Sequence, residues 1–301
     1  MTTRRRFLAI TAAALALPAG TQAREIYTWT GTALGAGASL RLSHDNAPAI
    51  AARAATEIER LEAIFSLFRG NSALSQLNRD GVLAAPPFEL LECLSLAGAV
   101  HHATDGLFDP SVQPLWAAYA EAATQGQAPS EQSLAQARAR SGWGGVTLDA
   151  AAITLRPGMA LTLNGIAQGY IADRVAEMLA SEGLSNILID TGELRALGEQ
   201  PQGVAWPVKL AQGGEVALAA RALATSAPLG TVFDTAGRLG HILNPKTGKT
   251  ATPRWRGVSI SAPSAALADG LSTAACLMNS QDEIMASLAR FQDCRLESAV
   301  S

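Results

Sequence analysis

Apolar residues recur at helical spacing in several parts of the chain. After Pro48, apolar positions recur every three or four residues with charged residues between them, which predicts an amphipathic helix packed on the core. Its inward positions are Ile50, Ala54, Ile58, Leu61, Phe65 and Phe68. Further helices are predicted over residues 72–77, after the Pro86-Pro87 pair, after Pro114, from Ile166 to Gly183, and near the end of the chain.

Shorter apolar or alternating runs predict strands, mainly in the C-terminal third. They cover residues 26–43, 146–148, 153–155, 161–163, 186–190, 194–197, 206–210, 216–219, 223–226, 240–243 and the segment from Val258. Helices therefore alternate with strands early, and strands dominate later. The pattern predicts an α+β fold with mixed β-sheets flanked by helices, built as one large domain or two intimately packed ones.

The first 23 residues have the composition of an export signal. Arg4, Arg5 and Arg6 precede a run of apolar residues that ends at Leu17 and is too short to span a bilayer. The paired arginines favour the twin-arginine route, so we expect a periplasmic protein whose mature part is residues 24–301. Nothing in the sequence suggests a membrane anchor in the mature part.

Composition excludes several classes of function. With 301 residues, 48% apolar and 16% charged, the chain can bury a large core. Without the three signal arginines, the 23 basic residues become 20 against 26 acidic ones, a net charge of −6. That balance does not favour nucleic acid or an anionic membrane as a partner. Cys93, Cys276 and Cys294 lack a metal or redox spacing and are interpreted as small core residues.

The stretch from Leu161 to Asp173 contains a glycine turn between a predicted strand and a predicted helix. Gly165 and Gly169 carry no side chain that would keep a ligand away from the backbone N–H groups at the helix start. This is the outline of an anion site. A tight connection between two elements explains the same pattern, because this glycine spacing is common.

A second candidate site lies in residues 258–278, a strand followed by a helix that is apolar or small nearly all round and is therefore buried. Asp269 is the only charge in that helix, and Thr273 lies one turn further on the same face. Their oxygens suit a hard cation such as Mg²⁺. Alternatively, Asp269 pairs with an arginine and Thr273 bonds to a backbone carbonyl. The residues alone leave both readings open.

His241 precedes an Asn-Pro turn in a loop-rich region close in sequence to the Asp269 helix. A lone histidine is more often structural than catalytic. Its place in a loop nevertheless makes it a candidate, because loops carry function more often than cores do.

Six ordered motifs, together covering essentially the whole mature chain, resemble the ApbE family of FAD:protein FMN transferases. They lie at residues 65–78, 106–110, 164–173, 224–226, 241–248 and 262–273, and include Gly-Leu-Phe-Asp-Pro and Asn-Gly-Ile-Ala-Gln-Gly-Tyr. The resemblance implies a metal, Mg²⁺, held by the Asp269 carboxylate, the Thr273 hydroxyl and the backbone carbonyl of Ala167.

The resemblance also implies where FAD lies and how it reacts. FAD would lie along Leu34, Phe68, Leu107, Phe108, Asp109, Thr162 and Gln168, with the Gly165 turn as donor to its phosphates. A Ser or Thr hydroxyl of an acceptor protein would attack the phosphorus on the FMN side, His241 would take the proton, and AMP would leave. The acceptor would thereby carry a phosphoester-linked flavin.

The sequence departs from the family pattern mainly around the expected flavin. Thr162, Asn164, Gln168 and Asn244 replace Asp, Gly, Lys and Asp, Leu34 to Ala36 replace Met-Gly-Thr, and the Asp190 to Glu193 turn is one glycine short. This pattern, with the signal, is similar to the NosX-type branch, which is associated with flavinylating a membrane electron-transfer protein. A periplasmic FAD carrier and an FAD pyrophosphatase remain alternatives.

Overall fold

The computed structural model describes residues 25–252 and 254–301. The predicted export signal, residues 1–23, lies outside these residues. Among the described residues, no helix combines the length and the apolar character needed to cross a bilayer.

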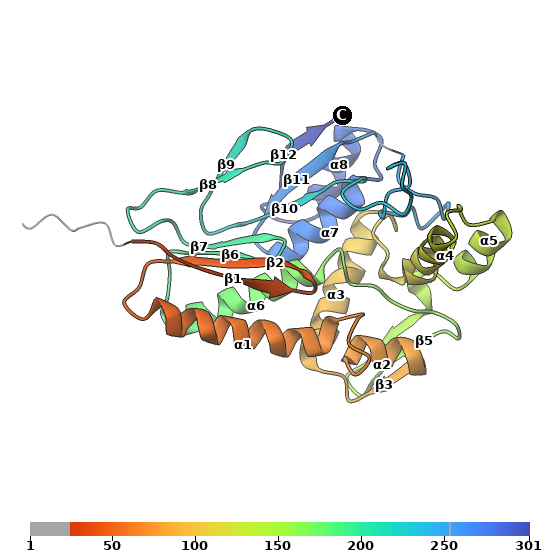
Figure 1. The fold of residues 1–301 in the computed structure, drawn as a ribbon, viewed down its shortest axis with the longest axis horizontal. Helices are drawn as coiled ribbons and strands as arrows, with labels where there is room; N and C mark the ends of the chain where they lie inside the picture. Colours follow the sequence, from red (N-terminus) through yellow and green to blue (C-terminus); the bar gives the residue numbers. More distant parts are fainter. Residues whose placement is uncertain (1–24, 253) are drawn as a thin grey trace, which may run out of the picture.

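The centre of the fold is a seven-stranded sheet in the order β1-β2-β6-β7-β10-β11-β12 (Figure 1). Its strands are β1 (Tyr27–Ala33), β2 (Ala36–Leu42), β6 (Ile187–Asp190), β7 (Leu194–Leu197), β10 (Ala222–Ser226), β11 (Gly257–Ala262) and β12 (Arg295–Val300). Two smaller sheets contain β3 (Val82–Ala84), β5 (Ala152–Leu155) and β4 (Val146–Leu148), and the pair β8 (Trp206–Lys209) and β9 (Glu215–Leu218). The described strand pairs are antiparallel. The predicted α+β class is confirmed, with antiparallel instead of mixed sheets.

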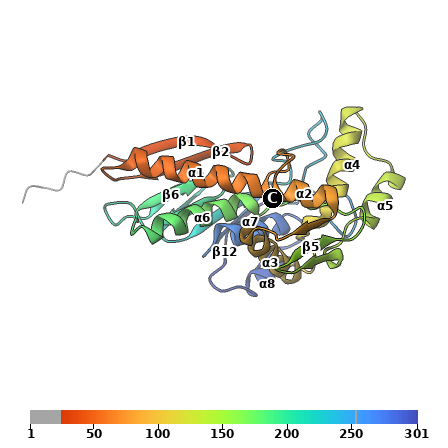
Figure 2. The same cartoon turned by 90° about the horizontal axis from the view of Figure 1, so that it is seen from below.

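Helices cover one face of the large sheet. The helices are α1 (Ala47–Phe65), α2 (Ala73–Asp80), α3 (Phe88–Ala103), α4 (Gln113–Thr124), α5 (Glu131–Ala139), α6 (Ala167–Ser181), α7 (Ala265–Ala275) and α8 (Gln281–Leu288), with 3₁₀ turns at Pro110–Val112 and Trp143–Gly145. α1 and α6 lie side by side, and α7 packs between α6 and α3 (Figure 2). α4 and α5 form a separate pair at one end of the molecule.

The alternation of side chains along the central strands explains the two layers. Ile187 and Ile189 of β6 belong to the main core beneath the helices. Leu188, between them, belongs to a second core under the β8–β9 hairpin, which is built around the fully buried Trp206. Successive side chains of a strand point to opposite faces, so a run of apolar residues requires cover on both sides.

Three sequence predictions of local structure are wrong. The first helix ends at Phe65, and Phe68, predicted to face the core, is 81% exposed in the loop that follows. Residues 161–163 are not a strand, because their backbone bonds to other partners: Asn78 holds both the N–H and the C=O of Leu161, at 2.7 and 2.8 Å. Residues 240–243 make only isolated bridges. β12 and α5 have no counterpart among the predicted elements.

The contact between α6 and α7 is unusually close. A Cβ added at Gly169 would lie 2.3 Å from the carbonyl oxygen of Ala265, so only glycine fits at this crossing. The carboxylate of Asp173, one turn further along α6, accepts hydrogen bonds from the Ser264 hydroxyl and from the N–H groups of Ala265 and Ala266, at 2.8–2.9 Å. A negative charge at the start of α7 satisfies otherwise unpaired N–H groups and complements the helix dipole.

We expect Gly169→Ala to lower the free energy of unfolding by about 1–3 kcal/mol, because the added methyl group meets backbone atoms that cannot rotate away. Chemical denaturation measures this change. Gly70→Ala is the matched control, since nothing lies within 4 Å of the added Cβ there. Equal stability of the two variants would contradict the close helix crossing.

Candidate active site

A cavity of about 330 Å³, here called the central cavity, lies where the start of α6 meets the side of α7. The predicted site residues that line it are Leu107, Phe108, Asp109, Thr162, Gly165, Gln168, His241, Asp269 and Thr273. They come from four separate parts of the chain: the loop after α3, the turn into α6, the loop after β10, and α7. The structure therefore brings the two candidate sites of the sequence analysis and His241 together.

Gly165 lies where the turn into α6 approaches α7 and leaves little room for a side chain. A Cβ added there would lie 3.0 Å from Oγ1 of Thr273 and 3.4 Å from the ring of Phe108. The Thr273 hydroxyl itself lies 3.3 Å from Oγ of Ser226, at the end of β10. The glycine turn is thus packed directly against the hydroxyl predicted to bind a cation.

Asp269 is buried, and its Oδ2 atom has no hydrogen-bond partner. Among the described residues, no lysine or arginine forms an ion pair with it, which contradicts the alternative that Asp269 is neutralised by an arginine. A buried carboxylate oxygen without a partner costs several kcal/mol. Burial raises the pKa of Asp269 to about 8, although a hydrogen bond from the Gly169 N–H acts in the opposite direction.

Glu193 is a second buried carboxylate in the central cavity, and the sequence analysis did not identify it as a site residue. Its Oε2 accepts a hydrogen bond of 3.3 Å from the Thr225 N–H. Burial, reinforced by the charge of Asp269, holds the pKa of Glu193 well above its usual value. The available signal was the turn from Asp190 to Glu193, which places two acids directly after a buried strand.

The acidic side chains that line the central cavity are Asp109, Glu193 and Asp269, and no lysine or arginine of the described chain lines it. In their ionised form these carboxylates would repel a phosphate-bearing ligand. A divalent cation would relieve both the repulsion between the carboxylates and the unpaired Oδ2.

The donor set that could hold such a cation is limited to few side chains. In the described part of the chain, no group of three or more His, Cys, Asp and Glu residues is placed to hold a metal ion. The set predicted from the family resemblance does not need one, because it combines one carboxylate with a hydroxyl and a backbone carbonyl. Ala167 is buried and stands in the sequence midway between two glycines. Gly165 lies against the Thr273 side chain, and the Gly169 N–H donates a hydrogen bond to Asp269. The residues present fit Mg²⁺, which retains waters and takes few protein ligands.

His241 lines the same cavity and is partly buried. Its Nδ1 lies 3.1 Å from the carbonyl oxygen of Thr231, which can only accept, so Nδ1 carries the proton and Nε2 is the free acceptor. Burial lowers the pKa of His241 below its ordinary 6.5, and the bond to Thr231 offsets part of this effect. The imidazole is therefore neutral at pH 7 and suited to accept a proton.

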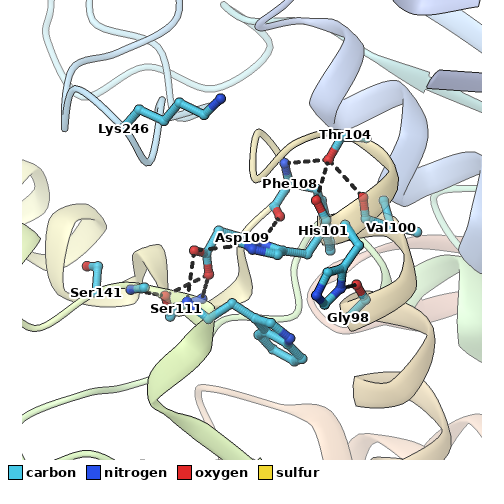
Figure 3. Close-up of polar contacts among 12 residues, drawn as sticks. Gly98, Val100, His101, Thr104, Phe108, Asp109, Ser111, Ser141 and Lys246 are labelled. Carbon is cyan, nitrogen blue, oxygen red and sulfur yellow. Dashed lines mark hydrogen bonds and ion pairs between the residues drawn. The ribbon is translucent and has the colours of Figure 1, made fainter. Parts of the chain in front are cut away.

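Asp109 forms one wall of the central cavity and is fixed by a dense set of contacts (Figure 3). Its Oδ1 accepts from the N–H and the hydroxyl of Ser111, at 2.8 and 2.6 Å, and its Oδ2 accepts from the Trp143 N–H at 3.2 Å. His101 Nδ1 donates to the Phe108 carbonyl at 2.9 Å and lies 3.8 Å from Oδ2. The loop that carries Leu107 and Phe108 is thereby held in place.

Two residues predicted to contact FAD lie outside the lining of the central cavity. Leu34 is in the β1–β2 turn with a positive φ of 50°, and its N–H donates to Glu62 at 2.6 Å. Glu62 also pairs with Arg69, next to the exposed Phe68. Leu34 and Phe68 thus belong to one corner of the fold, and their contact with FAD stays a prediction.

The fold and the cavity define an α+β protein whose ligand site lies between the start of one helix and the side of another. The sequence profile of the ApbE family matches residues 30–296, so the chain belongs to the ApbE family.

Curated relatives and solved structures agree with this family. A protein of Haemophilus influenzae named FAD:protein FMN transferase is 28% identical over 87% of this chain and 83% of its own, and one of Klebsiella pneumoniae with the same name is 28% identical over 74% and 73%. The crystal structure of the ApbE protein of Thermotoga maritima superposes with a TM-score of 0.78, at 25% identity over 86% of this chain and 90% of that chain. The apo flavinyl transferase ApbE of Pseudomonas stutzeri gives 0.76, at 24% identity over 88% and 87%.

Without divalent cations, we expect Asp269→Asn to be more stable than the wild type. Burial raises the pKa of the Asp269 carboxyl from its ordinary 3.8 in the unfolded chain to about 8 in the folded protein. Below the lower pKa the carboxyl is protonated in both states, and burying it then costs no stability through ionisation. As pH rises from the lower pKa through the upper one, the free energy of unfolding falls, because the unfolded chain can ionise more easily than the folded protein. The advantage of the variant, measured as the difference in Tm in a chelating buffer, should therefore grow from roughly pH 5 to pH 8.

Added Mg²⁺ should reverse the order, raising the Tm of the wild type and leaving that of Asp269→Asn unchanged. Parallel pH curves for the two proteins, or equal stabilisation by Mg²⁺, would contradict a cation site at Asp269.

Proposed function

We propose that this protein is an FAD:protein FMN transferase that uses Mg²⁺ and modifies a Ser or Thr hydroxyl of an acceptor protein. The observation that carries the proposal is the buried Oδ2 of Asp269, which has no hydrogen-bond partner. His241 lines the same cavity, and no lysine or arginine of the described residues does. Membership of the ApbE family and the names of the relatives support FAD as the donor.

The proposed reaction assigns a task to each part of the cavity. The acceptor hydroxyl oxygen forms a bond to the phosphorus on the FMN side of FAD, the bond from that phosphorus to the bridging oxygen breaks, and AMP leaves with that oxygen. Nε2 of His241 accepts the hydroxyl proton. Asp269, Thr273 and the Ala167 carbonyl would hold Mg²⁺, which when bound offsets the charge of the diphosphate.

The departures from the family pattern make the cation more important in this chain. Gln168 lines the cavity where the family commonly has a lysine, so this side chain offers no positive charge to the diphosphate. Its backbone carbonyl accepts a 2.7 Å hydrogen bond from Thr191, which fixes the start of α6 beside the Asp190 to Glu193 turn. Neutralisation of the diphosphate therefore falls to the ion at Asp269 and to backbone N–H groups.

We also propose that the enzyme acts in the periplasm, as residues 24–301 after removal of the signal. The support for this location is the arginine-rich start of the sequence and the apolar run that follows it. An acceptor on the periplasmic side of an electron-transfer membrane protein would be accessible to it.

We expect Asp269→Ala to reduce FMN transfer by roughly 10²–10³-fold and His241→Ala by roughly 10²-fold, with FAD binding largely kept in the second variant. The assay incubates the mature protein with FAD, Mg²⁺ and a candidate acceptor, and measures acceptor mass and AMP. His44→Ala, which changes an exposed histidine, is the control. Free FMN with AMP would identify a pyrophosphatase, intact FAD a carrier, and full activity of both variants would refute the residue assignments.

The pH dependence of transfer follows from the neutral state of His241. Because burial lowers its pKa below 6.5, we expect the rate at low substrate and saturating Mg²⁺, which keeps Asp269 ionised, to be constant above about pH 6.5 and to decline in more acidic buffer, as the imidazole gains a proton. The residual activity of His241→Ala should lack this acidic decline. An unchanged profile in the variant would show that another group accepts the proton.

A further inference from the structure

A second hollow lies on the outer side of Asp109 and is here called the outer cleft. It consists of two contiguous hollows of about 350 and 460 Å³ that share Asp109, Gly142, Pro245 and Lys246. One extends to His101 and Trp143, and the other extends along α5. The reaction described above does not use it.

The outer cleft and the central cavity have one lining residue of the described chain in common. Asp109 lines both, and its carboxylate is occupied by Ser111 and the Trp143 N–H. The loop that places His241 in the central cavity places Lys246 at the outer cleft, five residues further on. Figure 3 shows Lys246 on this facing loop, apart from the contacts that hold Asp109.

The outer cleft carries exposed positive charge, and the carboxylate that lines it, Asp109, is buried and bonded to Ser111 and the Trp143 N–H. Arg138, Arg156 and Lys246 line it, and all three are exposed. The Arg156 guanidinium donates to the carbonyls of Ala139 and Ser141, at 3.1 and 3.0 Å. No carboxylate of the described chain forms an ion pair with any of the three cations.

Other arginines of the described chain pair with carboxylates, as Arg53 does with Glu182 and Arg60 with Glu57 and Glu89, whereas the cations of the outer cleft gather in one place without such a partner. Three unpaired cations on one cleft favour a ligand that brings negative charge with it.

The floor of the outer cleft leaves space for a polypeptide backbone. Nothing lies within 4 Å of the position that a Cβ would take at Gly142 or at Gly144, and Gly142 has a positive φ of 118°. The aliphatic part of the Arg138 side chain packs over Gly248: a Cβ added at Gly248 would lie 2.8 Å from Cδ of Arg138. This contact holds the Arg138 guanidinium beside the cleft. Glycine backbone without side chains leaves room for an extended polypeptide segment, and the cations beside it can pair with carboxylate side chains of that segment.

We infer that the outer cleft binds an acidic segment of the acceptor protein, adjacent to the Ser or Thr that enters the central cavity. The inference rests on the proposed transferase function. The acceptor hydroxyl that reaches the phosphorus of FAD in the central cavity is part of a polypeptide, and this polypeptide must continue out of the cavity. Asp109 is the part of the cavity wall that also lines the basic outer cleft. The diphosphate of FAD has its own site beside Asp269, so the cleft cations are available to the acceptor.

The test compares two labelled peptides that contain one threonine, one with glutamates and one with glutamines on the flanks. We expect wild type to bind the acidic peptide more tightly, with an affinity that falls as salt is added. In the double variant Arg138→Glu with Lys246→Glu, binding of the acidic peptide should weaken by roughly tenfold, and binding of the neutral peptide should not change. Fluorescence anisotropy measures both.

Lys209→Glu is the matched control, because Lys209 is an exposed lysine on β8 at the other end of the molecule. It should bind both peptides as the wild type does. Equal binding of the two peptides by the wild type, or an unaltered affinity in the double variant, would overturn the inference.

FAD binding separates this inference from two other outcomes. The double variant should bind FAD with the affinity of the wild type, measured by quenching of flavin fluorescence. Weaker FAD binding with unchanged peptide binding would show that the outer cleft holds the nucleotide half of FAD, and would overturn the inference. Failure of the wild type to transfer FMN would refute the proposed function, whereas the peptide affinities report on the cleft independently of turnover.

Discussion

The site depends on how closely α6 and α7 approach each other. Gly169 lies against the backbone of Ala265, where no side chain fits between the two helices. The Asp173 carboxylate caps the first turn of α7 and so fixes the same end of this helix. This junction holds Asp269 beside the Gly165 turn. A buried carboxylate can remain unpaired only where the surrounding packing is rigid enough to prevent its escape to water. The stability of the helix crossing therefore offsets the cost of the site.

The same junction explains the chemistry assigned to the cavity. Its walls present carboxylates, hydroxyls and backbone groups but no lysine or arginine from the described residues, so in the proposed reaction the positive charge beside the diphosphate would come from an ion and from backbone N–H groups. The imidazole of His241 stays neutral because it is shielded from water, and its orientation is fixed by the Thr231 carbonyl. The proposed cation site and proton acceptor thus come from different parts of the chain that line one cavity.

Sequence reasoning succeeded where a local pattern decides the structure. The stripe from Ile50 to Phe65 gave α1, and the apolar helix around Asp269 gave a buried α7. It failed where tertiary contacts decide: the backbone of Leu161 bonds to the side-chain amide of Asn78 instead of to a neighbouring strand, which no strand pattern reveals. Phe68 continued the helical spacing, although the chain leaves the helix at Ser66. Glu193 was missed because only the packing of its turn beside α7 places it near Asp269.

The central cavity also has a consequence for how the chain can be divided. Its lining residues run from Leu107 to Leu277, and the sheet beneath α7 is completed only by β12 at residues 295–300. No shorter fragment between these limits contains all of its walls. Saturable flavin binding would accordingly require that the chain from Leu107 to β12 is present and folded, which makes the ligand itself a probe of this region in truncation or circular-permutation studies.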